Sequence, residues 1–125
     1  RRWGTFVAGK TRKFDAISED HAAFWTLEYD TQAVFTMGEA VRACLSSPIE
    51  AISVPGYFAY SVDDQVVHPT RTKQVMTRWG GMVEKDLLEA GPGDDPMAHV
   101  MAGDIFSPGQ TAPLAERMIA WLRGL

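Results

Sequence analysis

The stretch that decides the fold is Tyr57-Phe58-Ala59-Tyr60-Ser61-Val62-Asp63-Asp64-Gln65-Val66-Val67-His68-Pro69. Together with the preceding Val54-Pro55-Gly56, its aromatic and uncharged first part predicts a buried strand ending at Ser61. Asp63-Asp64-Gln65 breaks this strand, and Pro69 suits the first position of a helix. We therefore expect a strand, an acidic loop and a helix in succession.

The chain after this helix repeats the pattern. Gly80-Gly81 is expected to end the helix in a left-handed conformation, and Met82 to Leu88 predicts a second strand, charged enough to lie at a sheet edge. The segment 91–96, rich in Gly, Pro and Asp, predicts a loop, and an apolar stripe predicts a last helix from about Thr111 to the end. Two strands joined by a helix are expected to be parallel, with a right-handed crossover, so the fold class is α/β.

The chain before this stretch predicts helices. Ser18 is a plausible N-cap for a helix carrying Ala22, Trp25 and Tyr29 at helical spacing. A second helix is indicated by apolar residues at i, i+3, i+4, i+7 and i+8, and Ser46-Ser47-Pro48 ends it. These residues are Met37, Ala40, Val41, Cys44 and Leu45. Their pattern suggests that Cys44 is a small buried hydrophobic residue and no nucleophile.

Composition narrows the class of protein. A chain of 125 residues is long enough for one domain, and its net charge of −4 argues against nucleic acid as the main partner. No apolar run approaches the roughly 20 residues of a membrane span, and no signal peptide follows Arg1-Arg2-Trp3. With a single cysteine, Cys44, the chain forms no internal disulfide, and we expect a cytoplasmic location.

Asp64 and His99 are the candidate catalytic residues. Each follows one of the two predicted parallel strands, and side chains beyond the carboxyl ends of such strands can meet. A carboxylate bound to one imidazole nitrogen fixes the tautomer, so the other nitrogen can take a proton from a nucleophile. On spacing alone, a turn-forming Asp and a structural His remain the plainer interpretation.

Two motifs strengthen the catalytic interpretation, because they resemble the α/β-hydrolase superfamily, in particular its esterase- and lipase-like serine hydrolases. In that family a small residue, two variable positions and the catalytic Asp precede a variable residue, two aliphatic residues and often a proline. Ser61 to Pro69 fits this pattern with Asp64, not Asp63, at the acid position. The segment Asp95-Pro96-Met97-Ala98-His99-Val100-Met101-Ala102-Gly103-Asp104 resembles the loop of the catalytic His, and Arg78-Trp79-Gly80-Gly81 resembles the end of the intervening helix.

The resemblance implies that residues 37–125 are the C-terminal portion of such a hydrolase and that residues 1–36 belong to a cap segment. It implies hydrolysis of a carboxylic ester or related acyl substrate, with Asp64 orienting His99 and with no cofactor. The family's G-x-S-x-G nucleophile motif is absent from this chain, so we expect the nucleophile upstream of Arg1. Ser46, Ser47 and Ser61 are poor substitutes, since the first two end a helix and the third matches the small residue of the acid loop.

Several alternatives stay open or fail. Dehalogenation by an aspartate nucleophile is a second hydrolase chemistry, and a non-catalytic fragment or association module is a different class. The aspartate pairs at 63–64 and 94–95 lack calcium-loop spacing, and His21, His68 and His99 lack zinc-site spacing. An unpaired edge of the Val54–Ser61 strand predicts a homodimer, or a complement from the missing N-terminal part.

Overall fold

The computed structural model describes residues 9–125, so Arg1 and Arg2 of the predicted cap segment lie outside the described residues. The chain divides into two compact units, Arg1–Ser47 and Pro48–Leu125. The division falls at the end of the helix α3 (Thr31–Ser46), whereas the sequence analysis placed a boundary after residue 36, inside the segment that forms this helix.

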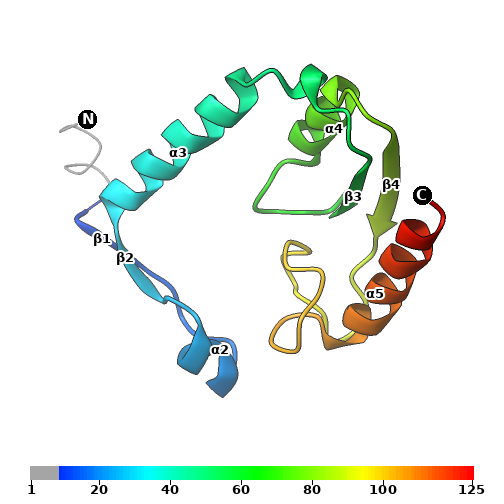
Figure 1. Ribbon diagram of the computed structural model, residues 1–125. Helices are drawn as coiled ribbons and strands as arrows, with labels where there is room; N and C mark the ends of the chain where they lie inside the picture. Colours follow the sequence, from blue (N-terminus) through cyan, green and yellow to red (C-terminus); the bar gives the residue numbers. More distant parts are fainter. Residues whose placement is uncertain (1–8) are drawn as a thin grey trace. The chain divides into compact units, whose positions relative to one another are not determined.

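The described part of the first unit, residues 9–47, contains two short strands and two helices (Figure 1). Strand β1 (Thr11–Lys13) pairs antiparallel with β2 (Glu28–Asp30), and neither strand was predicted. The predicted N-cap is confirmed, because the Ser18 hydroxyl accepts a hydrogen bond from the backbone N–H of His21 at the start of α2 (Glu19–Phe24). Tyr29 was assigned to that first helix but lies in β2, where its ring contacts Phe14 at a centroid distance of 5.6 Å.

Helix α3 begins earlier than the apolar pattern suggested, because Asp30 caps it through a 2.7 Å hydrogen bond from the N–H of Gln32. Its predicted apolar face is not buried within the unit: Met37 is 62% exposed and Val41 51% exposed. The prediction of a buried Cys44 is wrong, since this residue is exposed. Helical spacing gives the face that a residue occupies but not whether another element covers that face.

The second unit is built on a parallel pair of strands, as predicted. Strand β3 (Gly56–Ser61) pairs with β4 (Val83–Leu88) in a register that runs from Gly56 opposite Val83 to Ser61 opposite Leu88. A short 3-10 turn, η1 (Ile49–Ala51), precedes β3. Helix α4 (Pro69–Arg78) connects the strands and begins at the predicted proline. Helix α5 (Pro108–Arg123) ends the chain and starts slightly earlier than expected.

The two helices lie on opposite faces of this pair of strands. Tyr57 and Phe58 are adjacent in β3, so their side chains point to opposite faces. The Tyr57 ring contacts Trp121 of α5 at 5.2 Å, and the Phe58 ring contacts Trp79, at the end of α4, at 5.3 Å. On the α5 face, Asp86 also accepts hydrogen bonds from Arg117 and from the Tyr57 hydroxyl. The unit is thus a mixed α/β arrangement of two helices around a parallel strand pair.

The role predicted for Gly80 and Gly81 is wrong. Neither has a positive φ, and α4 ends instead at Trp79 in an extended conformation. The two glycines lie against the backbone before β3: a Cβ on Gly80 would be 2.0 Å from the Glu50 carbonyl oxygen, and one on Gly81 would be 2.2 Å from that of Val54. Close backbone approach, not a left-handed turn, requires glycine here.

The buried apolar core is small. Among residues 9–125, the buried hydrophobic residues are Ile49, Tyr60, Leu88, Ala98 and Met101. Leu88, Ala98 and Met101 form one cluster with Leu114 of α5 packed against it, so the core adjoins the loop that carries His99. None of the helices within residues 9–125 combines the length and the apolar character that crossing a bilayer requires.

Candidate active site

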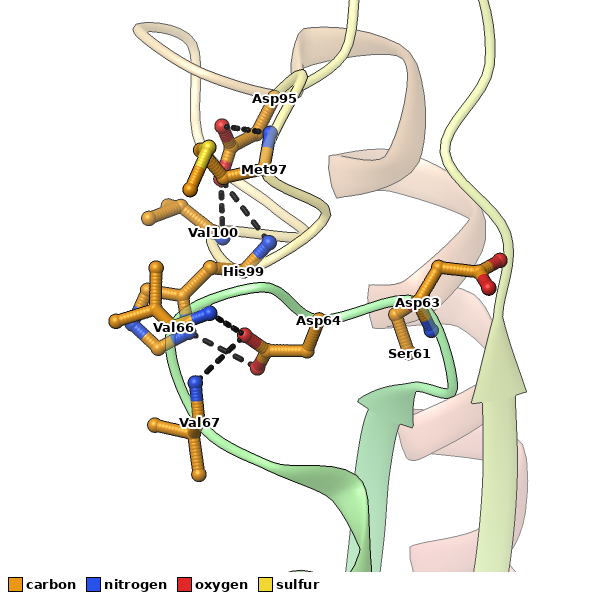
Figure 2. A network of polar contacts seen from close by, with 9 residues as sticks. All are labelled: Ser61, Asp63, Asp64, Val66, Val67, Asp95, Met97, His99 and Val100. Atoms are coloured by element: carbon orange, nitrogen blue, oxygen red, sulfur yellow. Dashed lines mark hydrogen bonds and ion pairs between the residues drawn. The ribbon is translucent and has the colours of Figure 1, made fainter.

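Asp64 and His99 are in direct contact beyond the carboxyl ends of β3 and β4. Figure 2 shows the Asp64 carboxylate facing the His99 ring, and the distance from Asp64 Oδ2 to His99 Nδ1 is 3.0 Å. The other carboxylate oxygen accepts the backbone N–H groups of Val66 and Val67, both at 2.8 Å. The prediction that these two side chains lie within hydrogen-bond reach is therefore confirmed.

The environment of Asp64 favours the ionised form. Burial raises the pKa of this carboxyl, but the hydrogen bond to His99 and the N–H groups of Val67 and Val66 outweigh it and lower the pKa below its usual value. An ionised carboxylate accepts hydrogen bonds only, so the proton between the two side chains belongs to Nδ1 of His99. In a neutral imidazole with its proton on Nδ1, Nε2 is the unprotonated nitrogen.

The second imidazole nitrogen is available for chemistry. The His99 side chain is 36% exposed, and no residue within the described range 9–125 hydrogen-bonds its Nε2. A cavity of about 340 Å³ lies beside the pair. Its walls come from the strand ends, both loops and the two helices, and include Ser61, Asp64, Thr72, Leu88, His99 and Leu114. The His99 side chain thus borders a space large enough for a small ligand group.

Asp63 takes no part in this contact. Figure 2 shows its carboxylate pointing away from Asp64 and His99. Its backbone N–H donates to the Ser61 hydroxyl at 3.2 Å, which closes the turn after β3. The sequence-based choice of Asp64 over Asp63 as the partner of His99 is confirmed, since adjacent residues in this turn point in different directions.

A buried carboxylate that the sequence analysis did not select organises the His99 loop. Asp95 is 4% exposed and accepts three backbone N–H groups: those of Met97 at 2.9 Å, His99 at 3.0 Å and Val100 at 2.8 Å (Figure 2). Burial raises the pKa of Asp95, but these three bonds outweigh it and lower the pKa below its usual value. The Asp-Pro pair and its distance of four residues from His99 were the available signal, because Asp commonly hydrogen-bonds the backbone two residues ahead.

The acid loop and the His99 loop are bound to each other by the residue that follows Asp64. The Gln65 backbone N–H donates to the Met97 carbonyl at 3.0 Å, and its side-chain amide donates to the Pro96 carbonyl at 3.2 Å. The two loops that carry Asp64 and His99 are therefore joined by the Gln65 bonds as well as by the contact of the two side chains.

The remaining candidate residues lie elsewhere. His68 caps α4 by accepting from the N–H of Thr70, and His21 is buried in the first unit, accepting from the N–H of Ile17. Ser61 lines the cavity but is 1% exposed and carries no hydrogen bond to His99. Across the described part of the chain, no three His, Cys, Asp or Glu side chains are grouped so that they could hold a metal ion.

Comparison with known proteins adds no relationship to this geometry. No protein-family model matches the sequence, and neither a curated protein nor a solved structure matches the chain.

Proposed function

We propose that this chain is the C-terminal portion of an α/β-hydrolase-type serine hydrolase that acts on carboxylic esters or related acyl substrates. The observation that carries the proposal is the 3.0 Å contact of Asp64 with His99 at the carboxyl ends of two parallel strands. The matching sequence motifs of the acid loop and the histidine loop support it independently. Residues 1–36 would then be part of a cap segment.

The chemistry follows from the tautomer. His99 Nε2 accepts the proton of a serine hydroxyl as its oxygen attacks the acyl carbon, and the imidazolium so formed is stabilised by the Asp64 carboxylate. The same nitrogen then returns the proton to the leaving alcohol oxygen. Water repeats the sequence on the acyl-enzyme and releases the acid and the free serine. The serine and the oxyanion donors come from outside these 125 residues, because the G-x-S-x-G motif is absent.

A second candidate is a non-catalytic association module. It is favoured by β3, which pairs with β4 only within the described residues and so leaves its other edge open. An open edge with aromatic side chains is suited to pairing with another strand. The partner would be a second copy of the chain or a complementary part of the same protein.

Measurements on the native protein distinguish the two candidate functions. An antibody against the second unit would isolate the protein from its source, and mass, fluorophosphonate labelling and turnover of short-chain aryl esters would be measured. We expect a mass well above 13.8 kDa, labelling at one serine, and esterase activity. A protein of 13.8 kDa that is neither labelled nor active would favour the association module.

Two adjacent aspartates provide a matched pair of variants for the active protein. Asp64→Asn is expected to lower kcat about 10³–10⁴-fold, because an amide in place of the carboxylate favours the wrong tautomer of His99. Asp63→Asn makes the same chemical change one residue away, where the side chain points elsewhere, and leaves kcat unchanged. Equal activity of the two variants would refute the assignment of Asp64.

A further inference from the structure

We propose that Asp95 is a positioning residue for His99: it fixes the backbone on both sides of the histidine and thereby sets the imidazole against Asp64. The catalytic meaning of this role rests on the proposed function. The placement itself does not, because it concerns the geometry of the chain and can be measured without a substrate.

The hydrogen bonds of Asp95 enclose His99 in the sequence. Its carboxylate accepts the N–H groups of Met97, His99 and Val100, and its own backbone carbonyl accepts that of Ala98 at 2.9 Å. Every N–H from residue 97 to residue 100 is therefore bound to Asp95. A single side chain controls the direction in which the His99 side chain leaves the backbone.

The backbone held in this way is strained. Ala98 has a φ of 50°, in the left-handed region that residues other than glycine rarely adopt. Its side chain is 5% exposed and packs in the cluster with Leu88 and Met101, which a glycine could not do. The Asp95 bonds on either side of Ala98 oppose relaxation of this conformation, and relaxation would rotate the peptide that leads into His99.

Asp95 is itself held by a second buried residue. The Asp95 N–H donates to the Ser107 hydroxyl at 3.1 Å, and that hydroxyl donates to the Val100 carbonyl at 2.6 Å. Ser107 is fully buried and precedes α5. The two ends of the loop, at Asp95 and Ser107, are thus hydrogen-bonded to each other. These bonds connect the His99 loop to the start of α5.

The test compares two adjacent aspartates in the 125-residue chain. Asp95→Asn keeps one acceptor oxygen but turns an NH₂ group toward at least one of the three N–H donors. Asp94→Asn is the matched control, because Asp94 accepts instead from Gly91 N–H and from the Gln110 amide. In ¹⁵N-labelled protein, NMR would follow amide exchange at His99 and Val100 and the imidazole signals of His99, including the Nδ1–H proton.

We expect Asp95→Asn to speed exchange of the His99 and Val100 amides about tenfold or more, the effect of losing one hydrogen bond to a charged acceptor. The Nδ1–H signal of His99 should be lost and the ring nitrogens should average between the two tautomers. Asp94→Asn should leave all of these as in the wild type. Wild-type imidazole signals in a destabilised Asp95→Asn chain would overturn the proposal, because Asp95 would then be structural only.

Two further results keep the outcome unambiguous. If Asp95→Asn does not fold, Ser107→Ala is measured instead: it keeps the carboxylate but removes its anchor, so the same change of the His99 signals is expected, and unchanged signals would refute the role. A native protein without hydrolase activity whose His99 signals still depend on Asp95 would refute the proposed function and leave the positioning role intact.

Discussion

Replacing Gly80 by alanine tests how the second unit is held together. The residue follows α4 and passes against the backbone of the segment before β3, where a Cβ would lie 2.0 Å from the Glu50 carbonyl oxygen and 2.9 Å from that of Ile52. Both obstacles are backbone atoms, so no side-chain rotation relieves them. Since Gly80 has no positive φ, alanine is excluded here only by contact.

The magnitude follows from these distances. Cβ atoms essentially never approach another heavy atom within 3.0 Å, so the two backbone segments must separate by about 1 Å. The same two segments are joined by the Arg78–Glu50 ion pair at 2.6 Å and by the Trp79 indole N–H to the Val54 carbonyl at 2.9 Å, which resist separation. We expect a loss at the upper end of the overpacking range, about 3 kcal/mol. For a unit of this size, that lowers Tm by more than about 10 °C.

Thermal unfolding followed by circular dichroism measures this effect. Gly109→Ala is the control within the same unit. Gly109 lies in the first turn of α5, and a Cβ there would meet only Asp94 Oδ1, at 3.6 Å. Its Tm should be unchanged or slightly higher. A Gly80→Ala chain that melts within about 2 °C of the wild type would refute the close-approach reasoning.

Three more predictions concern the site and the strand edge. Asp64 and Asp95 have pKa values below those of the unfolded chain, so the stability they contribute is present above about pH 4 and is lost as the pH falls through their folded pKa values. In Asp64→Asn and Asp95→Asn, the free energy of unfolding should therefore fall less steeply on acidification than in the wild type, and identical curves would contradict this. The purified 125-residue chain should not be labelled by a fluorophosphonate probe, and labelling at a defined serine would show that it carries its own nucleophile. Light scattering should give a mass above the 13.8 kDa of one chain because the open edge of β3 pairs, whereas a stable monomer at micromolar concentration would speak against that pairing.

The parts of the fold that follow local rules could be predicted from the sequence. The start of α4 at Pro69, the parallel pairing of β3 with β4 and the meeting of Asp64 with His99 all followed from one strand–helix–strand pattern. Parallel strands place their carboxyl ends at one edge, so the loops after them become neighbours even when 35 residues separate Asp64 from His99.

The parts that depend on contacts between distant segments could not be predicted. A glycine pair after a helix has the same appearance whether it supplies a left-handed turn or a close approach, and only the position of Glu50 and Val54 decides. Likewise, helical spacing identified the face of α3 with Met37 and Val41 but not its exposure. The role of Asp95 was not predicted, because an Asp in a loop usually bonds only its own turn, whereas here its side chain is buried and its N–H bonds Ser107 before α5.

The cost of the His99 loop is an argument for its role. A loop that only connected β4 with α5 would place glycine at a φ of 50°, as the same loop does at Gly93 and Gly103, both of which have positive φ. Instead an alanine takes this conformation, at a cost on the order of 1–2 kcal/mol, beside a buried carboxylate that accepts three backbone N–H groups. The conformation of Ala98 opposes folding stability, whereas the Asp95 bonds hold the backbone around it, and His99 is the residue that follows. Strain of this kind persists where the surrounding structure holds it in place, and here Asp95, Ser107 and the Gln65 bridge do so around His99. The loop thereby holds the His99 imidazole in one orientation, with Nδ1 on Asp64 and the ring beside the cavity. That orientation is the one that the proposed proton transfer by His99 requires.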